Sequence, residues 1–249
     1  MALSFRTGAL STALSSGTAL ATGVTVAVGD FAIVTVSQNG TLASQITSIS
    51  SFSDSAGNTW TQTIPLTLCS HTTTSASMAT YTSVITNASS NLTITTSFSV
   101  SGSSRTLQAD VITGFVGTAT LDPGGYNLIN NATTPGNSLS QPILNSGTGV
   151  VAAEACYAVV AAGGTIGSFS SFTETGITTT SYSQLEANSA NASSGAITTA
   201  APTSSSSLNF SWSTNRVSIS AGFTVYDSAP SGYNTPSIIR QAVTRAATW

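Results

Sequence analysis

Short runs in which apolar and hydroxyl residues alternate dominate the chain. The clearest spans residues 92–100, which read Leu-Thr-Ile-Thr-Thr-Ser-Phe-Ser-Val, and residues 217–220 repeat the pattern as Val-Ser-Ile-Ser. Successive side chains of a strand point to opposite faces, so this alternation predicts strands with one buried and one solvated face. Antiparallel sandwiches are built from such strands.

Further strands are predicted where β-branched and aromatic residues gather between turn residues. The expected ranges are 24–28, 31–36, 45–52, a strand through Trp60 and Ile64, 79–85, 107–116, 150–161, 178–185, 208–212 and 217–226. The long apolar run 150–161 predicts a central strand covered on both faces. Residues 121–141 are the least periodic and predict a long connection.

About a dozen strands separated by hydroxyl-rich turns predict an all-β protein, a two-sheet antiparallel β-sandwich of jelly-roll or immunoglobulin-like kind. The 249 residues contain no fixed-period repeat and no sharp shift of composition. We therefore expect one sandwich domain over residues 23–229, since all-β domains often reach this length. An extended N-terminal segment, 1–22, precedes it, and a C-terminal arm or short helix, 230–249, follows.

The C-terminal segment has the pattern of a short amphipathic helix. Thr235 can cap it with Pro236 at its first position, and apolar residues then recur at helical spacing. So short a helix is marginal alone, so it is expected to pack either on its own domain or on a neighbouring subunit. The residues expected to bind such a partner are Ile238, Ile239, Arg240, Val243, Arg245 and Trp249.

Charge is scarce and hydroxyl groups take its place. Only 5% of residues are charged, against about 25% in typical soluble domains. The five cations are all arginine, the net charge is −3, and Ser and Thr supply about a third of the chain. Nucleic-acid binding needs clustered cations, so it is not expected. Ordering Ser or Thr costs little side-chain entropy, which suits closely packed, repetitive assemblies.

Targeting and redox signals are weak. No apolar run approaches the roughly 20 residues of a membrane span, and residues 1–22 are too rich in hydroxyls for the apolar part of a signal peptide. We expect that segment to be retained and no membrane association. Cys69 and Cys156 are expected to be small buried residues rather than a disulfide framework.

Candidate catalytic groups are few. Cys69 and His71, the single histidine, share a strand face, but a cysteine catalyst also needs an orienting partner. Glu154, Glu174 and Glu186 are the acids considered for glycoside hydrolysis, although their spacing gives no sign that two converge. The sequence predicts a protein that is not an enzyme and that needs no cofactor and no metal.

Two further groups of residues could bind a ligand. Asp54-Ser55-Ala56-Gly57-Asn58 alternates oxygen ligands that could hold calcium, but an ordinary turn built on Asp and Asn is the simpler interpretation. Trp60, Trp212 and Tyr233 could form a platform for sugars. The two tryptophans lie in alternating segments, however, which favours packing in the core.

One segment carries a resemblance to known proteins. Residues 51–61, Ser-Phe-Ser-Asp-Ser-Ala-Gly-Asn-Thr-Trp-Thr, follow a Gly29-Asp30-Phe31 strand entry and precede a closing strand, Ala-Gly-Phe-Thr-Val, at residues 221–225. Over residues 23–228 the chain resembles the Ser/Thr-rich β-sandwich structural proteins found in phage virions and on bacterial surfaces. The resemblance implies a scaffold or surface role and brings no catalytic residue.

The expected function is therefore that of a structural virion protein: a capsid decoration or cement subunit, or a tail component. It would be made in the host cytoplasm and would pack against copies of itself and other virion proteins, such as a major capsid protein, through its termini. The alternative is a carbohydrate-binding or adhesin-type module on a phage fibre or a bacterial surface, extracellular in location, with a host surface glycan as partner.

Overall fold

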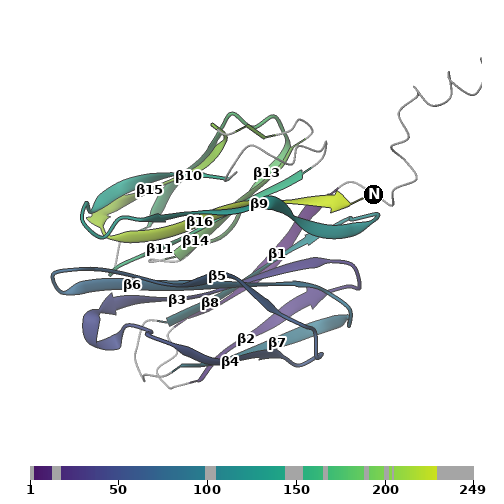
Figure 1. Cartoon of the computed structure of the whole chain (residues 1–249), viewed down its shortest axis with the longest axis horizontal. Helices are drawn as coiled ribbons and strands as arrows, with labels where there is room; N and C mark the ends of the chain where they lie inside the picture. The colour runs from purple at the N-terminus through teal and green to yellow at the C-terminus, as the bar shows by residue number, and fades with distance from the viewer. Residues whose placement is uncertain are drawn as a thin grey trace, which may run out of the picture.

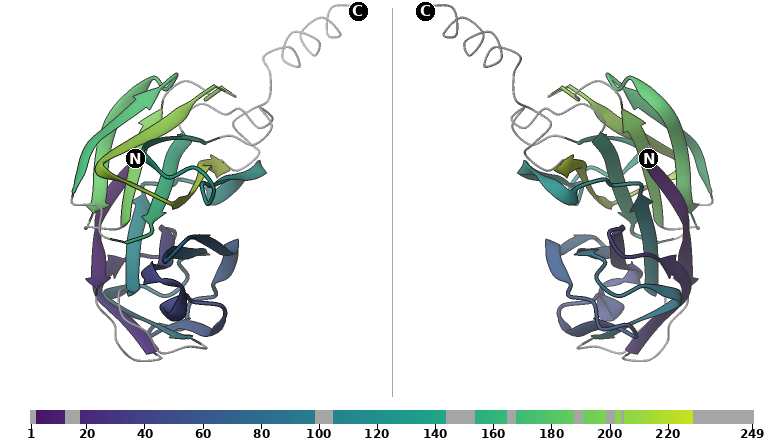
Figure 2. Two further views of the ribbon diagram at one scale, coloured as in Figure 1. Left: turned by 90° about the vertical axis from the view of Figure 1, so that its left-hand side faces the viewer. Right: turned by 90° about the vertical axis from the view of Figure 1, so that its right-hand side faces the viewer.

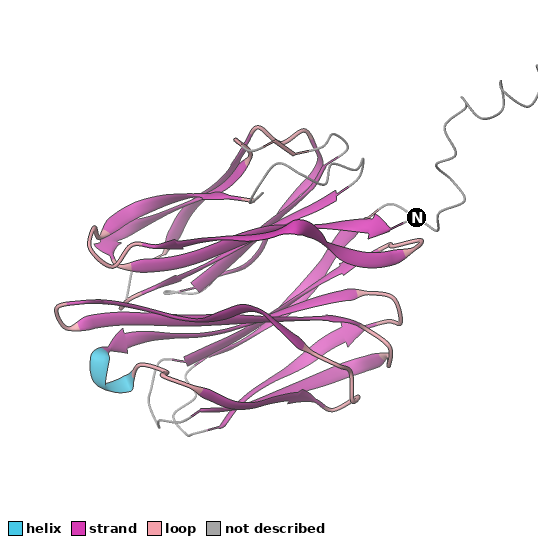
Figure 3. Cartoon of the chain, viewed as in Figure 1, coloured by secondary structure: helices cyan, strands magenta, loops and turns pink. Residues whose placement is uncertain are grey.

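Antiparallel strands make up nearly all of the chain that the structure describes (Figure 3). The computed structural model describes residues 3–12, 18–98, 105–143, 154–164, 168–187, 191–198, 202–203 and 205–228. Within these ranges the single helical element is the 3-10 turn η1, Leu42–Ser44. None is a helix long and apolar enough to span a membrane. The predicted class, an all-β antiparallel sandwich, is confirmed.

Among the residues that the structure describes, each half of the chain contributes eight strands. The first half contributes β1 (Ser4–Thr12), β2 (Thr18–Val26), β3 (Phe31–Thr41), β4 (Ile49–Asp54), β5 (Thr61–His71), β6 (Thr74–Val84), β7 (Ser89–Phe98) and β8 (Arg105–Thr113). The second half contributes β9 (Thr118–Asn130), β10 (Gly136–Pro142), β11 (Glu154–Ala162), β12 (Phe169–Thr175), β13 (Thr179–Ala187), β14 (Asn191–Thr198), β15 (Ser207–Arg216) and β16 (Ser218–Ser228).

The two halves repeat one topology. The first half forms a five-stranded sheet, ordered β1-β8-β3-β6-β5, and a three-stranded sheet, ordered β2-β7-β4. Adding eight to each strand number gives β9-β16-β11-β14-β13 and β10-β15-β12, which are the two sheets of the second half. In each half the first strand pairs with the eighth, the second with the seventh and the third with the sixth. This nested pairing is that of a jelly roll, so the chain is two jelly-roll units in tandem.

The four sheets stack as four layers (Figure 1). The three-stranded sheets lie outside and the five-stranded sheets lie inside, facing each other. Side views show the first half on one side of this central contact and the second half on the other (Figure 2). The inner sheets are therefore covered on both faces, and the outer sheets on one.

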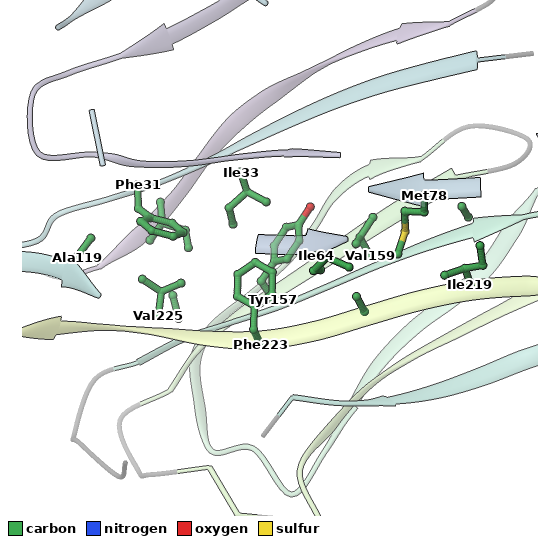
Figure 4. Packing of buried hydrophobic residues seen from close by; sticks show 14 of the residues in the cluster. Phe31, Ile33, Ile64, Met78, Ala119, Tyr157, Val159, Ile219, Phe223 and Val225 are labelled. Carbon is green, nitrogen blue, oxygen red and sulfur yellow. The ribbon is translucent and has the colours of Figure 1, made fainter. Parts of the chain in front are cut away.

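Three apolar clusters fill the spaces between the layers. In β3, Phe31 and Ile33 point toward the second half, while Val34 and Val36 point toward the outer sheet of their own half. Figure 4 shows the central cluster, in which Phe31 and Ile33 lie across from residues of β11 and β16 such as Tyr157. Because this cluster joins both halves, the two jelly rolls share a core.

Most predicted strands are present, and the apolar run predicted as a central strand is β11, which is buried along the residues whose exposure is described. The number of sheets is four rather than the two expected. Each half of the chain closes its own pair of sheets, one of five strands and one of three, which doubles the number.

The prediction of a long connection over residues 121–141 was wrong, because that stretch holds most of β9 and nearly all of β10. Pro123, Gly124 and Gly125 obscure the strand. They form a bulge, since Leu121 pairs with Val225 and Tyr126 already pairs with Phe223. An edge strand tolerates proline at such a bulge because the missing N–H is not needed there.

The two ends of the chain compare differently with their predictions. The expected N-terminal segment, 1–22, holds strand β1 and the first residues of β2, which belong to the chain's own sheets, so the sandwich begins before residue 23. The C-terminal arm or helix predicted over 230–249 lies outside the described residues.

Candidate functional site

The residues predicted to bind a partner cannot be placed. Ile238, Ile239, Arg240, Val243, Arg245 and Trp249 all lie outside the described residues, and so does Tyr233. Their role stays a prediction from the sequence.

The three glutamates considered for hydrolysis do not form a pair along the sheets. Glu154 begins β11 and pairs with Thr198 of β14, whereas Glu186 of β13 pairs with Ser193 of the same β14. Five residues of strand separate those two partners, or about 17 Å. Glu174 lies in a different layer, on β12 of the outer sheet. Glycosidase carboxyls stand within about 10 Å of each other, and the register puts the backbones of Glu154 and Glu186 farther apart than that.

The cysteine–histidine pair is not assembled for nucleophilic catalysis. Cys69 is buried, while His71 is exposed at the end of β5. Burial raises the pKa of the Cys69 thiol to about 11, so the thiol stays protonated at neutral pH and is a poor nucleophile. Cys69 and Cys156 are both buried and neither is in a disulfide, which confirms their prediction as small buried residues.

The turn after Asp54 is held by hydrogen bonds within the protein. The Asp54 carboxylate accepts hydrogen bonds from the backbone N–H groups of Ala56 and Asn58, at 2.7 and 3.2 Å, and from the Trp60 indole at 2.6 Å. This is the ordinary turn that the sequence favoured over a calcium loop. In the described part of the chain, no three side chains of His, Cys, Asp or Glu gather as a metal site.

The two tryptophans that could form a sugar platform pack against other residues of the protein. Trp212 is 2% exposed and donates its indole N–H to the Gly136 carbonyl oxygen at 3.0 Å. Trp60 is half-buried against Phe52, with ring centroids 5.3 Å apart. Core packing, the interpretation favoured from the sequence, is confirmed for Trp212.

A buried polar cluster lies where the inner sheets of the two halves meet. Asp110 and Gln108 of β8 face Tyr157 of β11 and Ser193 of β14, and all four are at most 1% exposed. The Tyr157 hydroxyl donates to Asp110 Oδ2 at 2.7 Å, and the Gln108 side-chain amide donates to Ser193 Oγ at 2.5 Å. Figure 4 shows the Tyr157 hydroxyl directed toward the sheet that carries Ile33.

Electrostatics in this cluster follow from burial. Burial and the neighbouring Asp110 hold the pKa of Tyr157 well above its usual value, while hydrogen bonds from Ser193 and Thr35 partly oppose the shift. The phenol therefore remains protonated and acts as donor to the carboxylate.

A second set of polar contacts extends the cluster along the same interface. The Ser37 hydroxyl donates to Asn191 Oδ1 at 2.7 Å, and Asn191 Nδ2 donates to Thr106 Oγ1 at 2.9 Å. The polar interface was not predicted from the sequence, because the alternating Gln108 and Asp110 have the same pattern as a solvated strand face. A second sheet covers that face instead.

The other notable site is a groove of about 370 Å³ on the outer sheet of the second half. It is lined by Ser138, Leu139, Ser140, Ser171, Asn209, Phe210 and Ser211. Its hydroxyls bond to one another, as in the 2.7 Å contact between Ser171 Oγ and Ser211 Oγ. The groove presents hydroxyl and amide groups and no ionisable side chain in its lining.

Comparison with known proteins adds no further information: no family model, no curated protein and no solved structure matches this chain.

Proposed function

We propose that the protein is a structural subunit of a phage-like virion, a capsid decoration or cement protein or another surface subunit, without catalytic activity of its own. It packs into a symmetric assembly with copies of itself and with other virion proteins. The observation that carries the proposal is a four-layer body whose outer sheets present hydroxyl groups in place of charges.

The short side chains of the surface support this role because ordering them costs little conformational entropy. On the outer sheet of the second half, Asn209 Nδ2 donates to Thr175 Oγ1 at 3.0 Å, and Ser140 Oγ donates to Ser207 Oγ at 2.9 Å. These short side chains are already ordered by one another. Packing them against a neighbour therefore costs less than ordering lysine or glutamate side chains, at about 1.5–2 kcal/mol each.

The fold supports the proposal by analogy. Jelly rolls build many viral capsid proteins, and they also build lectins. Because one fold hosts many functions, the analogy adds weight only together with the surface chemistry.

Assembly in particles is the test. The protein should be found in many symmetric copies when purified virions of its source are imaged or analysed by mass spectrometry. Changing Ile238 and Val243 together to Asp should prevent incorporation, because both lie on the predicted apolar stripe. Changing Thr244 to Asp, off that stripe, is the matched control. A protein that stays monomeric and absent from particles would overturn the proposal.

Glycan binding is the second candidate, favoured by the uncharged groove on the outer sheet. Its hydroxyl and amide groups suit a neutral sugar. On a glycan array, the double change Asn209→Ala and Ser211→Ala should abolish any signal, while Ser53→Ala on the other outer sheet should leave it intact. Binding that survives the groove variant would remove this candidate.

A further inference from the structure

Four groups in the buried polar cluster are arranged as the parts of an acyl transfer. Ser193 supplies a hydroxyl, Gln108 a carboxamide, Asp110 a carboxylate and Tyr157 a phenol. The Ser193 hydroxyl lies 2.5 Å from the nitrogen of the Gln108 amide. A half-turn of that amide exchanges its nitrogen and oxygen, so the carbonyl carbon stays beside the hydroxyl in either orientation.

A continuous path leads from the hydroxyl to a base. The Ser193 hydroxyl lies close enough to the Tyr157 oxygen to lower the pKa of the phenol, and Tyr157 donates to Asp110 Oδ2 at 2.7 Å. The same oxygen, Asp110 Oδ2, lies 3.5 Å from the Gln108 nitrogen. A hydroxyl becomes a nucleophile when an adjacent group removes its proton, and these contacts supply that group.

We propose that Ser193 and Gln108 form an intramolecular ester that covalently joins the two halves of the protein. The hydroxyl oxygen of Ser193 attacks the side-chain carbonyl carbon of Gln108. Its proton passes through Tyr157 to Asp110, and Asp110 returns a proton to the departing nitrogen. The C–N bond of the amide breaks, one C–O bond forms, and one ammonia molecule leaves. No oxidant, metal or cofactor takes part.

Burial makes the step feasible and its product durable. The contact already holds the two groups side by side, which lowers the entropic cost of bringing them together. The Gln108 amide has still to rotate so that the face of its carbonyl carbon turns toward the hydroxyl. Water is excluded because all four residues are at most 1% exposed, so the ester is protected from hydrolysis once formed. Ammonia that escapes to bulk water is protonated there, which draws the reaction forward.

The composition of the chain leaves this route open and closes a route through lysine. An amide cross-link needs a lysine, and the chain has none, its five cations all being arginine. Hydroxyl and carboxamide side chains are abundant instead. An ester from Ser193 on β14 to Gln108 on β8 is a cross-link that this composition permits, and it spans the central interface.

A second serine–glutamine pair provides an internal control. The Ser220 hydroxyl donates to Gln141 Oε1 at 2.5 Å, and both residues are fully buried. The Gln141 nitrogen is held by the carbonyl oxygens of Asn127 and Pro142, at 3.2 and 2.8 Å. Among the described contacts of this pair there is no carboxylate or phenol to move a proton, so it should stay unreacted.

Intact mass under denaturing conditions tests the proposal. The purified full chain should be lighter than its sequence by the mass of one ammonia molecule, and not of two. Ser193→Ala should restore the full mass, whereas Ser220→Ala should keep the loss. Because a cyclised asparagine also loses ammonia, the Ser193 variant separates the two origins. Digestion with a protease that cuts between the two residues should yield one peptide containing both.

The proton path has its own test. Tyr157→Phe and Asp110→Asn, in samples whose circular dichroism shows a folded sheet protein, should carry the full mass or lose ammonia at least tenfold more slowly. Folded wild-type protein with its full sequence mass after prolonged incubation would overturn the proposal. So would ammonia loss that persists in Ser193→Ala.

Discussion

The two jelly rolls of this protein have the same strand order but fill their cores differently. Between the sheets of the first half, branched aliphatic side chains of similar size come from both sides, as Val34 and Ile94 do. In the second half the inner sheet contributes small residues such as Ala158 and Ala196, and the outer sheet contributes Phe210 and Trp212. Small residues facing large ones and equal residues facing each other both fill the space between sheets.

The difference teaches that the strand order sets the volume between two sheets more strictly than it sets which residues fill that volume. This explains why the sequence shows no repeat although the structure does. It also implies that the stability of the second half is concentrated in a few aromatic side chains, whose rings contact one another. Phe172 and Phe210, for example, lie 5.5 Å apart between centroids.

The variant with the largest expected effect tests whether the stability of the second half depends on a few aromatic side chains. Phe210→Ala should lower the free energy of unfolding by about 3–5 kcal/mol, because the alanines opposite it cannot close the cavity. Ile94→Ala in the first half should cost less unfolding free energy, a value toward the lower end of the range of about 2–5 kcal/mol for such changes. Urea unfolding of both variants gives the comparison. If Ile94→Ala costs more than Phe210→Ala, the two cores do not differ as described.

The contact between the halves should show an intermediate effect. A Cβ on Gly195 would lie 2.4 Å from the ring of Phe5, so Gly195→Ala forces that ring to move. We expect a loss of about 1–3 kcal/mol, typical of overpacking. Adding Phe5→Leu should recover much of it.

Gly136→Ala is the matched control, because a Cβ there meets nothing nearer than 3.6 Å. Its unfolding free energy should stay close to that of the wild type. An equal loss in both glycine variants would show that the contact with Phe5 does not set the effect.

The smallest perturbation uses the native thiols as probes. Cys69 lies in the cluster between the halves and Cys156 in the cluster inside the second half. With a pKa of about 11, only about one Cys69 thiol in a thousand is ionised at pH 8, so labelling of the native state should be slow. Its rate should rise with pH, since the thiolate is the reactive form.

The order in which the two thiols are alkylated shows which part of the protein opens first. Cys69 is on the edge strand β5 and Cys156 on the central strand β11. Mass spectrometry after timed alkylation should find Cys69 labelled first, because an edge strand opens at lower cost. Labelling of Cys156 before Cys69 would mean that the second half opens internally before the halves separate.

The sequence predicted the strands that are marked by an alternation or by an apolar run, and it missed strands that carry neither signal. Strand β7 follows the alternation of residues 92–98 and was found. Strand β14 was missed: its residues Asn-Ala-Ser-Ser-Gly-Ala-Ile-Thr are all buried, so no alternation marks them. Small polar residues enclosed between two sheets look like a loop in the sequence.

The polar cluster was unpredictable for a related physical reason. Gln108 and Asp110 alternate with Leu107 and Ala109, as a solvated strand would. Only the stacking of a second sheet turns that solvated face into a buried one. No local pattern in β8 carries information about a strand, β14, that begins some 80 residues later.

Nested pairing fixes an order of events during synthesis. Strand β1 cannot complete its sheet until β8 has been made, so each jelly roll closes late, through contacts between distant residues, and such contacts form slowly. The first half can close while the second is still being translated. Until then Phe31, Ile33 and Met78 lack their partners from β11 and β16. A nascent chain paused after β8 therefore offers an adhesive apolar face, and prompt completion of translation protects it from aggregation.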